Sequence, residues 1–108
     1  MIILDTSFLV ALSIENDSHY SRALLLANKL GQGKHGKQII SDYIFDEVIT
    51  VVFNKSRSLD LAIKFGFELR KNFEIIKIDN SIFEDAWKLF KDQKNTKFSF
   101  TDCTILSL

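Results

Sequence analysis

Two patterns of apolar and polar residues alternate along the chain. The continuous apolar run at 1–4 is typical of a strand buried on both faces of a sheet, and two further short strands are expected at 38–41 and 74–78. Between them, apolar residues recur at three- and four-residue spacing, which predicts helices. Strands separated by helices indicate βαβ units with parallel strands. The pattern therefore predicts a single domain over residues 1–108, of α/β class, with a parallel sheet in a three-layer α/β/α arrangement.

The helical segments have recognisable starts and inward faces. They are expected at 7–14, around 23–30, at 42–54, from Ser58 or Asp60 onward, at 79–90, and from about residue 102 to the end. The glycine-rich run 31–37 predicts a connector, because it follows a helix and lacks the spacing of a phosphate-binding loop. The residues expected to face inward in the 42–54 helix and its two successors are Ile44, Phe45, Val48, Val51, Val52, Leu61, Ala62, Phe65, Leu69, Ile82, Phe83, Ala86, Leu89 and Phe90.

The last segment, 103–108, is amphipathic and has neither a glycine nor a basic last turn to stop it. From this pattern we expect a domain that is cut short or is completed by something else.

Composition narrows the class of protein. The 14 basic and 14 acidic residues cancel, so nucleic-acid binding would need a local patch or a metal ion. No apolar run approaches the roughly 20 residues of a membrane helix, and the N-terminus has no signal-peptide pattern. The single cysteine, Cys103, excludes an internal disulfide and fits a reducing cytoplasm. It is expected to be a packed residue, because no histidine lies nearby in the sequence to activate it.

Three acidic residues fall where strands give way to helices. Asp5 ends what the pattern predicts to be a central strand, Glu47 lies one turn into the helix after the second strand, and Asp102 lies in the first turn of the last helix. In a parallel sheet such positions converge on one rim, the side where ligands and ions bind.

Each of these acids also has a plain structural interpretation. Asp5 is a good helix N-cap, and Asp102 follows Ser99 at capping-box spacing. Glu47 would favour the positive end of its helix. Three carboxylates at one semi-buried rim, however, repel each other and need compensation. A divalent ion would supply it, and the oxygen-only set favours Mg²⁺ or Mn²⁺ over zinc.

The ordered segments resemble a known family. Ile2-Ile3-Leu4-Asp5-Thr6-Ser7, then Ser41 through Glu47-Val48, then Ser99-Phe100-Thr101-Asp102-Cys103 are similar to the PIN-domain family, and most similar to the VapC-type toxins of toxin–antitoxin pairs. The resemblance spans nearly the whole chain.

The resemblance implies a parallel sheet between helices and an acidic pocket that holds Mg²⁺ or Mn²⁺ and hydrolyses RNA phosphodiester bonds. Asp5, Glu47 and Asp102 match three acidic positions of the family, and Thr6 or Ser7 matches a supporting hydroxyl. It further implies a homodimer and an antitoxin whose peptide covers the pocket.

One feature of the family pattern is not found. A fourth acid usually follows the third on a later strand, and Asp85 is out of order for that role and is expected to be solvated. A second hypothesis is therefore a non-catalytic PIN-like module that binds RNA or a protein. A phosphoacceptor receiver domain is a distant third, because it would need paired acids after the first strand.

Two further groups of residues bear on partners. Lys91, Lys94 and Lys97 lead up to the Asp102 segment and are candidates for contact with an RNA backbone, although a solvated helix face and loop is the simpler interpretation. The aromatic content exceeds what a small α/β core hides, which predicts a homodimer formed through Phe65, Phe67, Phe73, Phe83, Trp87 and Phe90.

Overall fold

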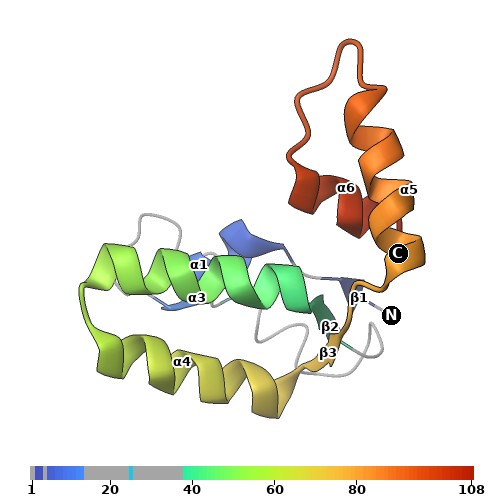
Figure 1. Ribbon diagram of the computed structural model, residues 1–108. Helices are drawn as coiled ribbons and strands as arrows, with labels where there is room; N and C mark the ends of the chain where they lie inside the picture. Colours follow the sequence, from blue (N-terminus) through green and yellow to red (C-terminus); the bar gives the residue numbers. More distant parts are fainter. Residues whose placement is uncertain (1, 4, 14–24, 26–37) are drawn as a thin grey trace.

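A computed structural model describes residues 2, 3, 5–13, 25 and 38–108 of the chain. The expected helix around 23–30 and the glycine connector at 31–37 fall outside this described part, apart from residue 25. The elements in order are β1 (Ile2–Ile3), α1 (Thr6–Ser13), β2 (Gln38–Ser41), α3 (Asp42–Ser56), α4 (Leu59–Asn72), β3 (Glu74–Ile76), α5 (Asn80–Lys91) and α6 (Phe100–Leu106), drawn in Figure 1.

The three described strands form one parallel sheet in the order β1-β2-β3. Ile3 pairs with Ile39 in the first ladder, and Ile40 pairs with Ile75 in the second. The predicted α/β class with a parallel sheet is confirmed. One detail was wrong: among the described strands β2 is central, whereas β1, which precedes Asp5, pairs on one side only.

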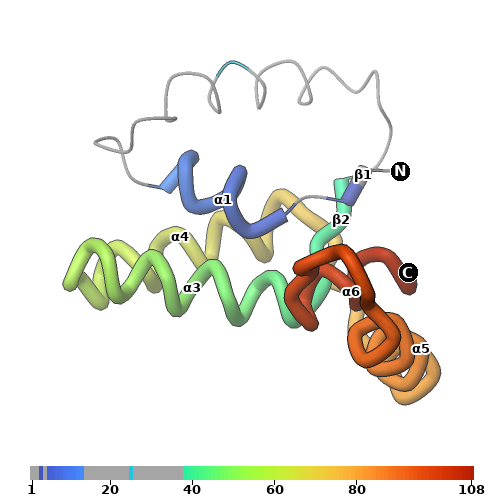
Figure 2. The backbone as a smooth tube through the Cα atoms, turned by 90° about the horizontal axis from the view of Figure 1, so that it is seen from above, coloured from blue at the N-terminus to red at the C-terminus, as the bar shows by residue number. Residues whose placement is uncertain are grey.

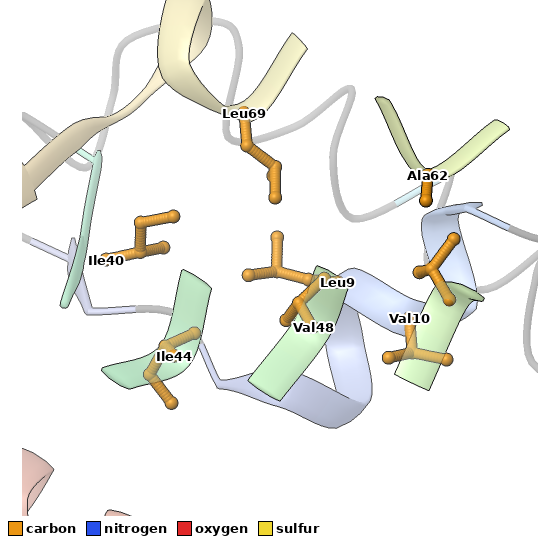
Figure 3. Packing of buried hydrophobic residues seen from close by; sticks show 8 residues of the cluster. Leu9, Val10, Ile40, Ile44, Val48, Ala62 and Leu69 are labelled. Carbon is orange, nitrogen blue, oxygen red and sulfur yellow. The ribbon is translucent and has the colours of Figure 1, made fainter. Parts of the chain in front are cut away.

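The core lies where α1, α3 and α4 pack together beside the sheet. Leu9 of α1, Ile40 of β2 and Val48 of α3 are fully buried, and Leu69 of α4 closes the cluster from the opposite side (Figure 3). The inward faces expected for α3 and α4 are confirmed, because the remaining members are buried or packed against this cluster: Ile44, Phe45, Val51, Val52, Leu61, Ala62 and Phe65.

Side-chain caps set the starts of four helices. Ser41, Ser58 and Ser99 each accept a hydrogen bond from the backbone N–H three residues on, and so does Asp79. The strong preference of serine and aspartate for this position is why the sequence located these helix starts to within two residues.

The segment formed by α5 and α6 with the loop between them, here called the α5–α6 hairpin, stands apart from this core. Both views place α6 next to the N-terminal part of α3, with α5 on the outer side of α6 (Figures 1 and 2). The expected burial of the apolar face of α5 was wrong for most of its members. Ala86 is the one buried residue of α5, and the side chains that remain exposed are Phe83, Trp87, Leu89 and Phe90.

Aromatic contacts join the hairpin to itself and to α3. The ring of Phe100 lies 5.2 Å from that of Phe83 and 6.1 Å from that of Phe90, edge to face in both cases. It also lies 6.4 Å from the ring of Tyr43 at the start of α3. Phe100 is therefore the aromatic residue that links the two regions.

No helix in the described part of the chain is long and apolar enough to cross a membrane.

Candidate functional site

A small cavity of about 90 Å³, here called the acidic pocket, lies where α1, α3 and α6 meet. Asp5, Glu47 and Asp102 all line it, although they come from three separate elements of the chain. The remaining lining residues are Thr6, Ser7, Ile44, Thr101 and Ile105. A water molecule occupies about 30 Å³ in the liquid, so this volume suits a cation with a few waters and not a nucleotide.

Asp5 is positioned by its role as a helix cap. Its Oδ1 accepts a hydrogen bond of 3.0 Å from the backbone N–H of Phe8, and its carbonyl oxygen accepts the first helical bond from Leu9. The cap uses one carboxylate oxygen. No described residue donates to the other, so capping and ligand binding do not exclude each other at Asp5.

Asp102 is held in the same way at the start of α6. Its Oδ2 accepts a 3.0 Å bond from the backbone N–H of Ser99, while its own N–H donates to Ser99 Oγ at 3.0 Å. This is the reciprocal capping box that the spacing allowed. The bond fixes the direction of the carboxylate, and its Oδ1 receives no hydrogen bond from the described residues.

Glu47 differs from the two aspartates. It lies on α3 one turn after the start, and no described residue forms a hydrogen bond or an ion pair with its carboxylate. Nothing in the described part therefore holds this side chain in one rotamer.

The expectation of a semi-buried rim was wrong, because all three carboxylates belong to exposed residues. Solvent screens the repulsion between exposed charges, so the three acids do not require a cation in order to coexist.

The hydroxyl of Thr6 is the one buried side-chain polar atom in the described part that has no hydrogen-bond partner. It lines the acidic pocket next to Asp5. An unmatched buried hydroxyl costs free energy unless a ligand, water or ion satisfies it. The neighbouring Ser7, also predicted as a supporting residue, lines the pocket as an exposed residue.

The donors in this pocket suit a hard cation in kind, since they are carboxylate and hydroxyl oxygens without a thiolate or imidazole. Within the described residues, however, no three His, Cys, Asp or Glu side chains are gathered closely enough to hold one ion together. The two observations agree if an ion here is bound by one or two carboxylates and completed by water, which is the usual state of Mg²⁺.

A single side chain organises the loop that leads into α6. Gln93 Nε2 donates to the carbonyl oxygens of Phe90 (3.2 Å) and Phe98 (3.1 Å). Its Oε1 accepts from the Phe98 N–H and from Thr96 Oγ1, both at 2.8 Å. Gln93 thus fixes Phe98, the residue immediately before the Ser99 cap. No pattern along the chain indicated this role, because a lone glutamine in a polar linker has no characteristic spacing.

The three lysines predicted to contact RNA are exposed, and none of them lines the acidic pocket. Lys91 forms an ion pair with Asp92 at 3.2 Å. Lys94 borders a separate cavity of about 700 Å³ between α5, the following loop and α6, together with Asp85, which is exposed as expected.

The sequence did not indicate the walls of the pocket. Ile44 was assigned to the apolar face of its helix, Ile105 fell within the amphipathic segment 103–108, and Thr101 was only the neighbour of Asp102. Helical spacing could have found Ile44, which precedes Glu47 by three residues on the same side of α3.

Cys103 is buried, as expected, on the side of α6 away from solvent. Burial raises the pKa of its thiol, and the neighbouring Asp102 carboxylate raises it further. Cys103 is therefore a packed thiol and not a nucleophile.

This chain thus combines a parallel α/β fold with a pocket that acidic residues from three elements line. The PIN domain family model matches residues 2–108, so this chain belongs to the PIN domain family. Among solved structures it is similar to VapC20 of Mycobacterium tuberculosis, a sarcin–ricin loop cleaving toxin. The TM-score is 0.81 at 21% sequence identity, over 99% of this chain and 79% of that one. No curated protein matches the chain significantly in sequence.

Proposed function

We propose that this protein is a divalent-metal-dependent endoribonuclease that hydrolyses RNA phosphodiester bonds at the acidic pocket. One observation carries the proposal: Asp5, Glu47 and Asp102, which are far apart in the sequence, line one cavity together with the unmatched hydroxyl of Thr6. Membership of the PIN domain family and the similarity of the fold to a toxin that cleaves RNA support it.

Asp5 and Asp102 would hold the ion, Mg²⁺ or Mn²⁺. Each is already anchored through one oxygen by a cap bond, so its second oxygen is aimed with little loss of side-chain entropy. When bound, such an ion lowers the pKa of water and offsets charge on a phosphate. Thr6 would donate its hydroxyl to a carboxylate or a bound water, which satisfies the buried atom.

Glu47 has a different proposed role because no described residue holds it. An exposed carboxylate that is free to change rotamer can orient a water molecule or accept its proton. It can also complete the ligand shell through water. Weak metal binding is expected from the three carboxylates that line the pocket, with water as the remaining ligands.

The proposed partners follow from the similarity to VapC20. The substrate would be RNA, and the protein would be the toxin of a pair whose antitoxin covers the pocket. Lys91, Lys94 and Lys97 stay candidates for backbone contacts outside the pocket. A homodimer is proposed through the exposed aromatics Phe67, Phe83, Trp87 and Phe90, whereas Phe65 and Phe73 pack against the core and are excluded from the predicted set.

The experiment is a comparison of Asp5→Asn with Asp79→Asn. Both aspartates are N-caps with the same hydrogen bond to the third helical residue, and asparagine caps about as well as aspartate. We expect Asp5→Asn to abolish RNA cleavage and weaken Mn²⁺ binding measured by calorimetry, with stability unchanged within about 0.5 kcal/mol. Asp79→Asn should leave cleavage and Mn²⁺ binding at the wild-type level.

Two outcomes would reject the proposal. If Asp5→Asn cleaves RNA as well as Asp79→Asn does, then Asp5 is only a cap. If the wild-type chain binds Mn²⁺ in an Asp5-dependent manner but cleaves no RNA, the protein is the non-catalytic binding module. The loosely gathered acids of the pocket are the observation that keeps this alternative open.

A further inference from the structure

Another cavity, of about 360 Å³ and here called the side groove, adjoins the acidic pocket. The two share Glu47 and Thr101 as lining residues. The floor of the side groove is a stripe on α3 at helical spacing, and Thr101 of α6 forms the facing wall. The stripe consists of Tyr43, Asp46, Glu47, Thr50 and Val51. Its volume falls in the range of small-molecule sites, about 300–1,000 Å³.

The chemistry of the side groove excludes a phosphate as its preferred occupant. Two carboxylates line it and no lysine, arginine or histidine does. A phosphate placed there would meet like charges without compensation. If the scissile phosphate lies at the acidic pocket, a neighbouring nucleotide that enters the adjoining side groove does so through an uncharged part, its sugar or its base.

Asp46 gives the side groove a preference among the uncharged groups of a nucleotide. No described residue donates a hydrogen bond to its carboxylate, so both oxygens are available to a ligand. An ionised carboxylate only accepts hydrogen bonds. Guanine presents two adjacent donors on its Watson–Crick edge, N1–H and the N2 amino group. Adenine and cytosine place an acceptor nitrogen beside their amino group, and uracil places carbonyls on both sides of its single N–H.

We infer that the side groove is a binding subsite for an unpaired guanine base next to the scissile phosphate, with Asp46 accepting from N1–H and N2–H. Thr50 and Thr101 supply hydroxyls that can donate to the base or the ribose, and the ring of Tyr43 forms an aromatic wall. The inference rests on the proposed function, because a nucleotide is the expected occupant only if an RNA phosphate is bound at the adjoining acidic pocket.

Nucleoside binding tests the subsite without any cleavage. Guanosine, adenosine, cytidine and uridine are titrated separately into ¹⁵N-labelled protein, and the amide signals of Glu47, Thr50 and Thr101 are followed. We expect guanosine to bind at least about fivefold more tightly than the others and to shift those signals first. Equal responses to all four nucleosides, or shifts confined to other residues, would overturn the inference.

Asp46→Asn is the decisive variant, because it replaces one acceptor oxygen by a donor of the same size. It should lower guanosine affinity about tenfold, in keeping with the loss of one charge-assisted hydrogen bond. The matched control is Asp85→Asn, an exposed aspartate inside α5 that lines neither the side groove nor the acidic pocket. It should bind guanosine as the wild-type protein does.

Cleavage of an RNA oligonucleotide library separates the two proposals. Cutting beside guanosine, with the preference lost in Asp46→Asn while cutting continues, supports both. Cutting without a guanosine preference overturns the subsite and leaves the ribonuclease standing. Guanosine binding at the side groove with no cutting of any RNA retains the subsite and rejects the ribonuclease.

Discussion

The two parts of this molecule are stabilised in different ways. In the part made by α1, α3, α4 and the sheet, large side chains are fully buried, among them Leu9, Ile40 and Val48. In the α5–α6 hairpin the buried residues are small, namely Ala86, Cys103 and Thr104, while Trp87 is 49% exposed. The hairpin instead relies on aromatic edge contacts, helix caps and the hydrogen bonds of Gln93.

The acidic pocket lies on the boundary between these parts. Asp5 and Glu47 belong to the well-packed part, and Asp102 belongs to the hairpin. Ile105 packs against the core from the hairpin side, and Phe100 reaches Tyr43. The distance between Asp102 and the other two acids therefore depends on few contacts, and a weakened hairpin would open the pocket before the fold is lost.

The largest difference should come from one substitution made in each part. Leu9→Ala removes a side chain that is 0% exposed, and Leu89→Ala removes one that is 46% exposed. We expect Leu9→Ala to lower the free energy of unfolding by about 3 kcal/mol and Leu89→Ala by less than about 1 kcal/mol. Urea denaturation measures both. Equal losses would mean that the apolar face of α5 is covered in solution, for example by a second copy of the chain.

A smaller effect should follow from removing matched caps. Ser58 and Ser99 make the same 3.0–3.1 Å bond to the third residue of α4 and α6, so Ser58→Ala and Ser99→Ala should each cost about 1 kcal/mol. The Ser99 hydroxyl also holds the backbone of Asp102, because it accepts a hydrogen bond from the Asp102 N–H. The bond to the Asp102 carboxylate comes from the Ser99 backbone N–H and is kept in Ser99→Ala, so the substitution acts on the position of the Asp102 backbone. We therefore expect Ser99→Ala alone to weaken Mn²⁺ binding. If Ser58→Ala weakens Mn²⁺ binding as much, the loss reflects general stability, and the pocket does not depend specifically on the α5–α6 hairpin.

The smallest effect concerns pH. Because burial and Asp102 raise the pKa of Cys103 in the folded protein, the unfolded chain releases this proton first. Between the unfolded pKa, about 8.5, and the higher folded value the unfolded state binds fewer protons, so stability falls as pH rises. Unfolding at pH 7 and pH 9.5 should show a larger loss for the wild type than for Cys103→Ala. Identical losses would indicate that the thiol is solvated.

The sequence predicted the well-packed part of the molecule better than the α5–α6 hairpin, and the reason is physical. Helical periodicity located the buried face of α3, and serine caps located helix starts, because both are local signals. The same periodicity wrongly buried Phe83 and Phe90, since it reports which face is apolar and not whether anything covers it. The exposure of the three acids could not be predicted either, because it depends on how separate elements meet.

The sequence predicted only part of the candidate site. The acids could be placed at one rim because parallel strands end together. The side groove could not, although its residues form an i, i+3, i+4, i+7 stripe, because a polar stripe on a helix is usually just a solvated face. The side groove differs from a solvated helix face because Thr101, which belongs to α6, also lines it.

Gln93 has a consequence for how this protein can vary between related organisms. Its side chain bridges from Phe90 to Phe98 and thereby fixes the length of the path between α5 and α6. Substitutions at Lys94, Asn95 or Lys97 change the surface chemistry of that path without touching the bridge. An insertion or deletion there would pull Phe98 away from it and turn the start of α6. The bridge should thus hold constant both the number of residues between 94 and 97 and the hydroxyl of Thr96, which donates to Gln93 Oε1, while side chains at 94, 95 and 97 can vary without disturbing it.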